Sequence, residues 1–205
     1  VVALDPVKQE ARTSKGERYT YDFLVLTPGL QINWNKVEGI SLDTLGAGNA
    51  HSIYDFVGAQ KTWTAIQEFV KKGGRGVFTD TYTKLKGGGA PNKICMLTEH
   101  WARKQGARDN VQIDYYCSSS ALYNVPLYTP RLLEIYEKRN IGLEVNTRVK
   151  GIDTLKKQVY LEKHETKKVK EFDEAQGREV EVEKKIVTPF VEDYDFLSFV
   201  PPQSA

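Results

Sequence analysis

Residues 76–117 decide the fold, and they read GVFTDTYTKLKGGGAPNKICMLTEHWARKQGARDNVQIDYYC. The pattern predicts a short apolar strand over residues 76–79 and a second strand, rich in Ile, Val and Tyr, over residues 111–117. Between them a glycine-rich loop runs into a helix over residues 92–104. A strand–helix–strand order predicts two parallel strands joined by a crossover helix, which is the repeating unit of α/β folds.

The same alternation continues on both sides of this stretch. Apolar residues between 53 and 70 recur at helical spacing, and Gly73-Gly74 supplies a C-cap. Downstream, an amphipathic helix over residues 129–139 leads to a strand over residues 142–145. We therefore predict a Rossmann-like doubly wound domain with three layers.

Beyond residue 147 the apolar period becomes two, which predicts an antiparallel β-meander. The run from Lys163 to Arg178 is rich in Lys and Glu, and we expect a solvated loop at a hairpin end. The expected strands are residues 148–152, 158–162, 178–182 and 185–187, followed by a final strand over residues 194–200.

The amino-terminal part differs from this pattern. Residues 19–27 alternate and end apolar, which predicts a strand that becomes fully buried, and Pro28-Gly29 stops it. Residues 1–29 contain no helix of their own, so we expect them to pack on something outside this chain. Both ends of the chain are typical of cuts through a longer polypeptide.

The composition is that of a soluble globular protein: 205 residues, 40% apolar, 27% charged and a net charge of +2. This charge gives no reason to expect nucleic acid or a membrane surface as a partner. The two cysteines are too few for a disulfide framework or a zinc cage, and none of the three histidines stands at metal-ligand spacing. We therefore predict no metal site.

The glycine-rich loop is the first candidate site, because glycines before a helix let backbone N–H groups approach a phosphate. A nicotinamide-dinucleotide fingerprint, however, begins directly after the strand, and here Asp80 to Lys86 intervene. Pro91 removes a donor, and the second strand lacks the ribose-binding acid at its end. These departures argue against NAD and favour a loop with another use.

Cys117 is the second candidate, since it stands at the carboxyl end of a parallel strand, where α/β folds bind ligands. A thiol there is redox-active only if its pKa is lowered, and the alternative is a small buried residue among tyrosines. Cys95 falls inside the helix, where packing against the sheet explains it.

The strand Thr20 to Gly29, which reads TYDFLVLTPG, resembles a motif of the two-dinucleotide-domain flavoproteins of the pyridine nucleotide-disulfide oxidoreductase superfamily. In these proteins the turn packs against bound FAD. A narrower resemblance covers nearly the whole chain: the linker from Pro28 to Ile40 and the block Lys86 to Lys93 (KGGGAPNK) look like those of sulfide:quinone oxidoreductases. In that family the block usually reads KCAGAPQK, so Gly87 occupies the position of a family cysteine that carries sulfur.

The resemblance implies an internal fragment of a peripheral membrane flavoenzyme, of the mitochondrial inner membrane or bacterial plasma membrane. That enzyme passes electrons from sulfide or a thiol-like donor through FAD to quinone, and a homo-oligomer is compatible with it. Residues 1–30 would then be the end of an FAD-domain segment, 31–50 a linker, 51–193 the second dinucleotide-binding-like domain, and 194–205 a strand that returns to the FAD domain. The residues implied to touch FAD are Val2, Thr27, Pro28 and Gly29, and those of the active-site loop are Lys86, Gly87, Gly88, Gly89, Ala90, Pro91 and Asn92.

The chain alone is not expected to be competent, because the second family cysteine and the first FAD fingerprint are not in it. A thiolate that carries sulfur cannot be replaced by the glycine at position 87. Two other interpretations therefore stay open. One is a catalytically degenerate relative that acts as a binding or interface module, and the other is a flavoprotein of the NADH:quinone type.

Overall fold

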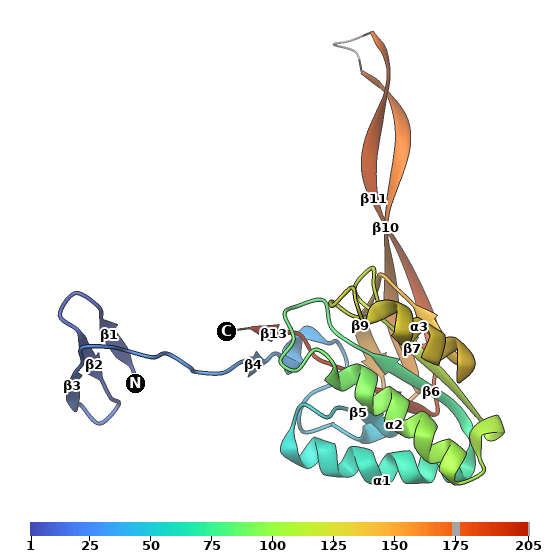
Figure 1. Ribbon diagram of the computed structural model, residues 1–205, viewed down its shortest axis with the longest axis horizontal. Coiled ribbons are helices and arrows are strands. Elements are labelled where there is room, and N and C mark those ends of the chain that lie inside the picture. Colours follow the sequence, from blue (N-terminus) through green and yellow to red (C-terminus); the bar gives the residue numbers. More distant parts are fainter. Residues whose placement is uncertain (174–176, 205) are drawn as a thin grey trace. The chain divides into compact units, whose positions relative to one another are not determined.

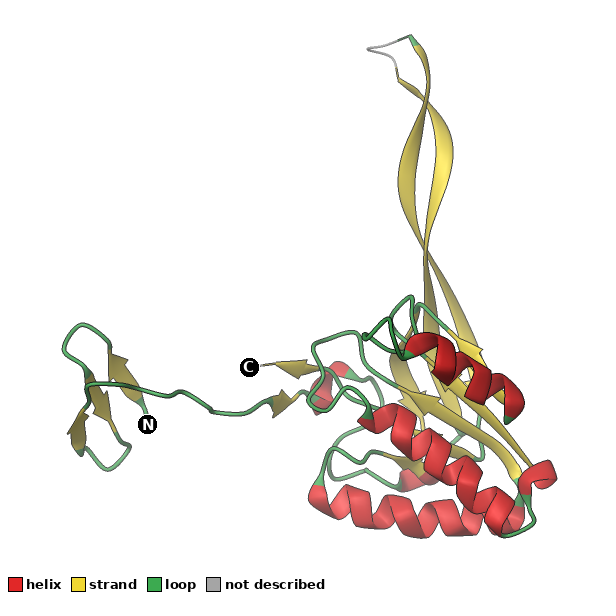
Figure 2. Cartoon of the chain, in the orientation of Figure 1, coloured by secondary structure: helices red, strands yellow, loops and turns green. Residues whose placement is uncertain are grey.

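The computed structural model describes residues 1–173 and 177–204, and these residues form two compact units, residues 1–29 and residues 30–204 (Figure 1). The larger unit holds all the helices of the described chain and most of its strands (Figure 2). The candidate active-site loop lies in this unit, whereas the residues expected to touch FAD lie in the smaller one.

A parallel sheet of five strands is the centre of the larger unit. Each neighbouring pair runs parallel, which confirms the predicted α/β fold. In spatial order the strands are β5 (Ala50–His51), β12 (Phe196–Ser198), β6 (Gly74–Thr79), β7 (Val111–Tyr116) and β8 (Ile141–Glu144).

Three helices connect these strands, close to the predicted bounds: α1 (Phe56–Lys72), α2 (Ala90–Lys104) and α3 (Thr129–Lys138). The side chain of Asp55 caps α1 by accepting a hydrogen bond from the amide of Gly58 at 2.8 Å, and Gly73 is its C-cap, as expected. Both α2 and α3 begin with a proline in the first turn, where the missing N–H costs nothing.

Two apolar cores lie on opposite faces of the sheet, because successive strand residues point to opposite sides. Phe78, Tyr115 and Phe196 pack against the three helices. Their neighbours Val77, Tyr116 and Leu197 pack instead against the antiparallel strands β9 (Thr147–Asp153) and β10 (Gln158–Asp173). The domain thus has the three predicted layers, with the meander in place of helices on the second face.

The loop predicted over residues 163–178 is wrong, because the chain pairs there with the third meander strand, β11 (Arg178–Asp193). Residues 163–173 continue β10 and pair with β11 without interruption, so they form a long two-stranded ribbon instead of a loop; residues 174–176 lie outside the described residues. The Lys and Glu residues meet across the ribbon, as in Lys168–Glu181 at 3.9 Å, and Val169 faces Val182. Cross-strand pairs of this kind stabilise a two-stranded ribbon. In the sequence alone, the same Lys and Glu residues look like a solvated loop.

The segments on either side of the predicted domain also belong to the larger unit. Residues 31–50, expected as a linker, include the short helices η1 (Trp34–Lys36) and η2 (Ala47–Asn49) and bury Val37, Ile40 and Leu45. Strand β12 lies inside the parallel sheet between β5 and β6. After it, β13 (Gln203–Ser204) pairs with β4 (Gln31–Ile32).

The smaller unit is an antiparallel sheet of β1 (Ala3–Asp5), β2 (Glu10–Arg12) and β3 (Arg18–Thr20). The strand predicted over residues 19–27 is wrong beyond Thr20: the following residues are irregular, and Phe23 and Val25 are 94% and 82% exposed. A buried strand needs hydrogen-bond partners along its edges, and no described strand pairs with residues 21–29.

Candidate active site

The candidate site is a cavity of about 260 Å³ at the carboxyl ends of β6 and β7. The loop after β6, residues 80–89, forms one wall, and the loop after β7 forms the other. Among the residues that line it are Thr83, Gly88, Ser119 and Tyr123. Ligands of α/β proteins bind at this edge of the sheet, so the fold places the glycine-rich loop where chemistry is expected.

Asp80 ties the two loops together. Its Oδ1 accepts a hydrogen bond from the amide of Ser118 at 2.7 Å, and its Oδ2 accepts one from the Cys117 thiol at 3.4 Å. Burial raises the pKa of the Asp80 carboxyl, against the effect of the Ser118 bond. This acid stands directly after β6, where a dinucleotide fingerprint has its first glycine, so the loop departs from that fingerprint at its first position.

Hydrogen bonds to the loop after β6 also come from residues that the sequence analysis did not identify, Tyr54 and Gln203. The Tyr54 hydroxyl donates to the carbonyl of Lys86 at 3.0 Å, and the Lys86 amide donates to the side chain of Gln203 at 2.9 Å. The Gln203 amide in turn donates to the Thr83 hydroxyl at 2.8 Å. Gln203 is buried in the folded chain, and no local sequence pattern predicts that it contacts this loop.

The three glycines leave an open backbone surface at the beginning of α2. Gly87 has φ +69°, and a Cβ added there would meet only the Ala90 Cβ, at 4.0 Å; a Cβ on Gly88 would meet nothing within 4 Å. A cysteine at position 87 therefore has room, but the left-handed backbone costs it about 1 kcal/mol relative to glycine.

The end of the predicted loop is structural. Asn92 is buried, and its Oδ1 accepts a hydrogen bond from the Tyr136 hydroxyl at 2.5 Å while its Nδ2 donates to the carbonyl of Leu122 at 3.2 Å. Pro91 is buried as well, whereas Lys86 and the glycines at 87 and 88 are exposed. The residues that a ligand can reach are therefore those at the start of the loop.

Neither cysteine has the surroundings of a reactive thiol. Cys117 is fully buried, and burial followed by the charge of Asp80 raises its pKa to about 12. Cys95 packs in the core between α2 and the sheet, and burial raises its pKa too. The thiolate that sulfur chemistry needs is therefore scarce at both positions near neutral pH.

The residues implied to touch FAD lie in the smaller unit. The amide of Val2 donates to the carbonyl of Arg12 at 2.8 Å, and the Val2 side chain is exposed. Thr27, Pro28 and Gly29 are exposed and outside regular structure. Their backbone is therefore open to a ligand within this unit.

Two absences hold for residues 1–173 and 177–204, the part of the chain that the structure describes. These residues contain no group of three or more His, Cys, Asp or Glu residues that could hold a metal ion. None of their helices combines the length and the apolar character that crossing a bilayer requires.

A parallel sheet with a helix layer on one face and an antiparallel meander on the other is the fold of the FAD-dependent oxidoreductases. No model of a known protein family matches the sequence. By sequence, however, the chain is a relative of the sulfide:quinone oxidoreductases. It is 31% identical to the mitochondrial sulfide:quinone oxidoreductase of Dictyostelium discoideum over 142 residues, which are 69% of this chain and 31% of that protein.

Two of the solved structures that share the fold are similar to the chain over nearly its whole length. The sulfide:quinone oxidoreductase of Aquifex aeolicus is 21% identical with a TM-score of 0.65, over 98% of this chain and 41% of that one. A chain of the mitochondrial ATP synthase of Tetrahymena thermophila is 19% identical with a TM-score of 0.67, over 100% of this chain and 46% of that one. The present chain spans about a third of the length of the curated relatives it matches.

Proposed function

We propose that this chain is part of a FAD-dependent oxidoreductase of the sulfide:quinone type, which passes electrons from sulfide or a thiol-like donor through FAD to a quinone. The observation that carries the proposal is the place of the block Lys86 to Lys93. The residues that resemble the family's sulfur-carrying loop stand at the carboxyl edge of the parallel sheet, beside a cavity. The sequence relationship to sulfide:quinone oxidoreductases supports it independently.

The chain's residues fit a flavin in the smaller unit. Thr27, Pro28 and Gly29 offer exposed backbone, Val2 offers an exposed side chain, and Phe23 and Val25 offer apolar surface that needs a cover. These are the residues that would hold the cofactor, and FAD supplies the two-electron acceptor when it is bound. The carboxyl of Asp80 at the end of β6 argues against nicotinamide dinucleotide as a second cofactor.

Within the larger unit, the exposed glycines let a small donor approach the backbone. The Lys86 side chain is exposed and forms no ion pair with another described residue. Its ammonium group favours an anionic donor such as hydrosulfide over a neutral thiol. As further parts of the proposal, the complete protein is peripheral to the mitochondrial inner or bacterial plasma membrane and is compatible with a homo-oligomer.

A second candidate is a catalytically degenerate relative that acts as a binding or interface module. Two observations favour it: Gly87 provides no thiol, and Cys117 is buried with a raised pKa. The fold is also found in a chain of an ATP synthase assembly.

Sulfide titration of the longest natural protein that contains this sequence separates the candidates. Bleaching of its flavin absorbance by sulfide, followed by reoxidation with a soluble quinone, supports the oxidoreductase. Bound flavin that sulfide does not reduce, but that is reduced once Gly87→Cys is introduced, supports the degenerate relative. Flavin reduced by NADH and not by sulfide would instead favour the NADH:quinone type.

A further inference from the structure

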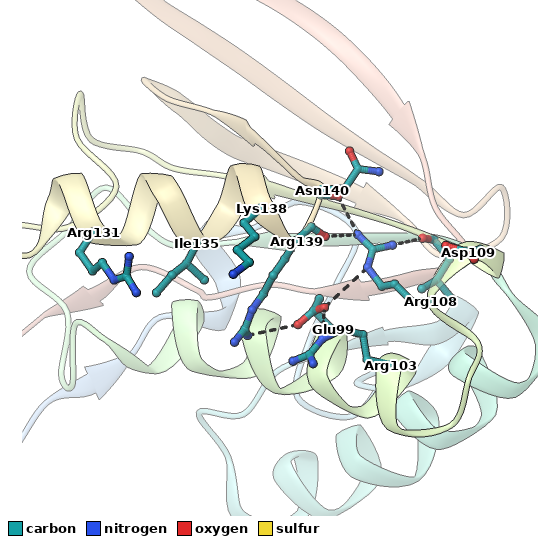
Figure 3. Close-up of a pocket in the computed structure, with 10 residues that line it drawn as sticks. Glu99, Arg103, Arg108, Asp109, Arg131, Ile135, Lys138, Arg139 and Asn140 are labelled. Carbon is teal, nitrogen blue, oxygen red and sulfur yellow. Dashed lines mark hydrogen bonds and ion pairs between the residues drawn. The ribbon is translucent and has the colours of Figure 1, made fainter.

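A second cavity, of about 690 Å³, lies at the opposite edge of the parallel sheet, where β7 and β8 begin (Figure 3). The carboxyl ends of α2 and α3 and the short helix η3 (Arg108–Asn110) form its walls. It is distinct from the candidate active site, which lies at the strands' carboxyl ends. Nothing in the proposed function uses it.

The carboxylate of Glu99 is the buried centre of this cavity, with a side chain that is 0% exposed. Its Oε1 lies 2.7 Å from Nε of Arg103 and 3.8 Å from Nε of Arg108, and its Oε2 lies 3.2 Å from Nη1 of Arg139. One carboxylate neutralises one guanidinium, so three arginines around it leave positive charge in a partly desolvated place.

Arg108 has a structural role that occupies its two terminal nitrogens. Its two terminal nitrogens donate to the carbonyls of Val111, Arg139 and Asn140, each at 2.7 Å. These bonds tie the end of α3 to the beginning of β7. Arg108 therefore anchors the cavity through its two terminal nitrogens, whereas its buried Nε has no hydrogen-bond partner among the described residues and lies 3.8 Å from Oε1 of Glu99.

Other side-chain donors around the cavity have no hydrogen-bond partner among the described residues. In the described parts of the chain, nothing pairs with Nη1 of Arg103, with Nε or Nη2 of Arg139, or with the ammonium of Lys138. Figure 3 shows Lys138 and Arg139 projecting from α3 toward α2, where Glu99 and Arg103 lie. Guanidinium and ammonium groups that converge on one space are the usual ligands of phosphate oxygens.

The charge balance also favours an anion. Arg131 lines the cavity but pairs with Glu134 at 2.5 Å, so it is left aside. The remaining lining residues are four cations (Arg103, Arg108, Lys138 and Arg139) and two acids (Glu99 and Asp109). Two helix carboxyl ends add about half a negative charge each, which leaves a net charge of about +1.

We propose that this cavity binds a phosphate-bearing anion through Arg103, Lys138 and Arg139. The proposal is independent of the oxidoreductase function. Phosphate is favoured over a single carboxylate because donors from two helices surround the space, and its oxygens accept from several directions at once. The anion can be free in solution or part of a lipid headgroup, and the same donors serve both.

Isothermal titration of the 205-residue chain with inorganic diphosphate tests the proposal. The variant Arg139→Gln should weaken binding about tenfold, and Lys138→Gln, which does not touch Glu99, about threefold. Lys104→Gln is the matched control, because it removes the same charge from the end of α2 at a residue that does not line the cavity. Binding to this control should stay within about twofold of the unaltered chain.

Three results would overturn the proposal: no binding of diphosphate, an equal loss in Lys104→Gln, or unchanged binding in Lys138→Gln and Arg139→Gln. If Arg139→Gln does not fold, as circular dichroism would show, Lys138→Gln decides alone. Sedimentation with vesicles of phosphatidate, compared with phosphatidylcholine, distinguishes the sources. Binding to phosphatidate vesicles that free diphosphate displaces indicates a headgroup, whereas binding of free diphosphate alone indicates a soluble ligand.

Discussion

The hydrogen bond between Asn92 and Tyr136 should be a main stabilising contact of the candidate site, because both side chains are buried. Asn92→Ala removes the acceptor of the Tyr136 hydroxyl, which keeps only its contact with the Cys95 thiol, and removes the donor to the Leu122 carbonyl. Each unpaired buried group costs about 1–3 kcal/mol, so the free energy of unfolding should fall by about 3–5 kcal/mol once the lost packing is included. Tyr136→Phe removes only the donor and should cost about 1–2 kcal/mol.

The double variant Asn92→Ala/Tyr136→Phe distinguishes the energy of this hydrogen bond from the separate effects of the two substitutions. When both partners are gone, neither is left unpaired by the other, so the combined loss should be smaller than the sum by about 1–2 kcal/mol. Urea unfolding followed by tryptophan fluorescence measures it. All three tryptophans (Trp34, Trp63 and Trp101) lie within residues 30–204, so the signal reports this unit alone.

The neighbouring exposed residue provides the control, since Lys93→Ala should change the free energy of unfolding by no more than about 0.5 kcal/mol. Losses that add within about 0.5 kcal/mol in the double variant would refute the reasoning, because they would mean that the two side chains do not interact. The candidate site would then lose the contact that fixes α2 against the loop after β7.

Three other predictions concern the larger unit. Arg75→Gln should lower the free energy of unfolding by about 2 kcal/mol in urea titrations, because it strands the partly buried carboxylates of Asp114 and Glu192. Burial, helped by Lys61, lowers the pKa of His51 to about 4. The unfolded chain then binds a proton at His51 that the folded chain does not, so the free energy of unfolding should fall by at most about 3 kcal/mol as pH drops from about 6.5 to about 4. His51→Phe should abolish this pH-dependent loss. Ellman's reagent should find no reactive thiol in the folded chain at about pH 8, and both cysteines after unfolding.

Local patterns were sufficient for the helices and the parallel strands. Hydrophobic period and capping residues act within a few positions of each other, so the elements around residues 76–117 could be predicted closely. The long ribbon could not, because its charges become favourable only in register. Lys170 lies 3.9 Å from Glu179 across the ribbon, and a sequence pattern does not reveal this pairing.

In the candidate site, too, the sequence predicted the local features but not the long-range contacts. The glycine-rich loop and its place before a helix were visible in the sequence, and so was Asp80 at the end of a strand. Its contact with the Ser118 amide depends on the pairing of β6 with β7, and the bond between Lys86 and Gln203 spans 117 positions. The alternation over residues 19–27 predicted a buried strand, but pattern alone could not show that no described strand pairs with it beyond Thr20. That residues 1–29 pack on something outside this chain stays a prediction.

The most direct test of the central claim is a sulfide titration of the longest natural protein that contains residues 1–205, followed by its visible absorbance. The proposed function predicts that the protein purifies with FAD and that sulfide bleaches the flavin band, which a soluble quinone then restores. A protein that purifies without flavin, and that binds none when FAD is added, would contradict the claim.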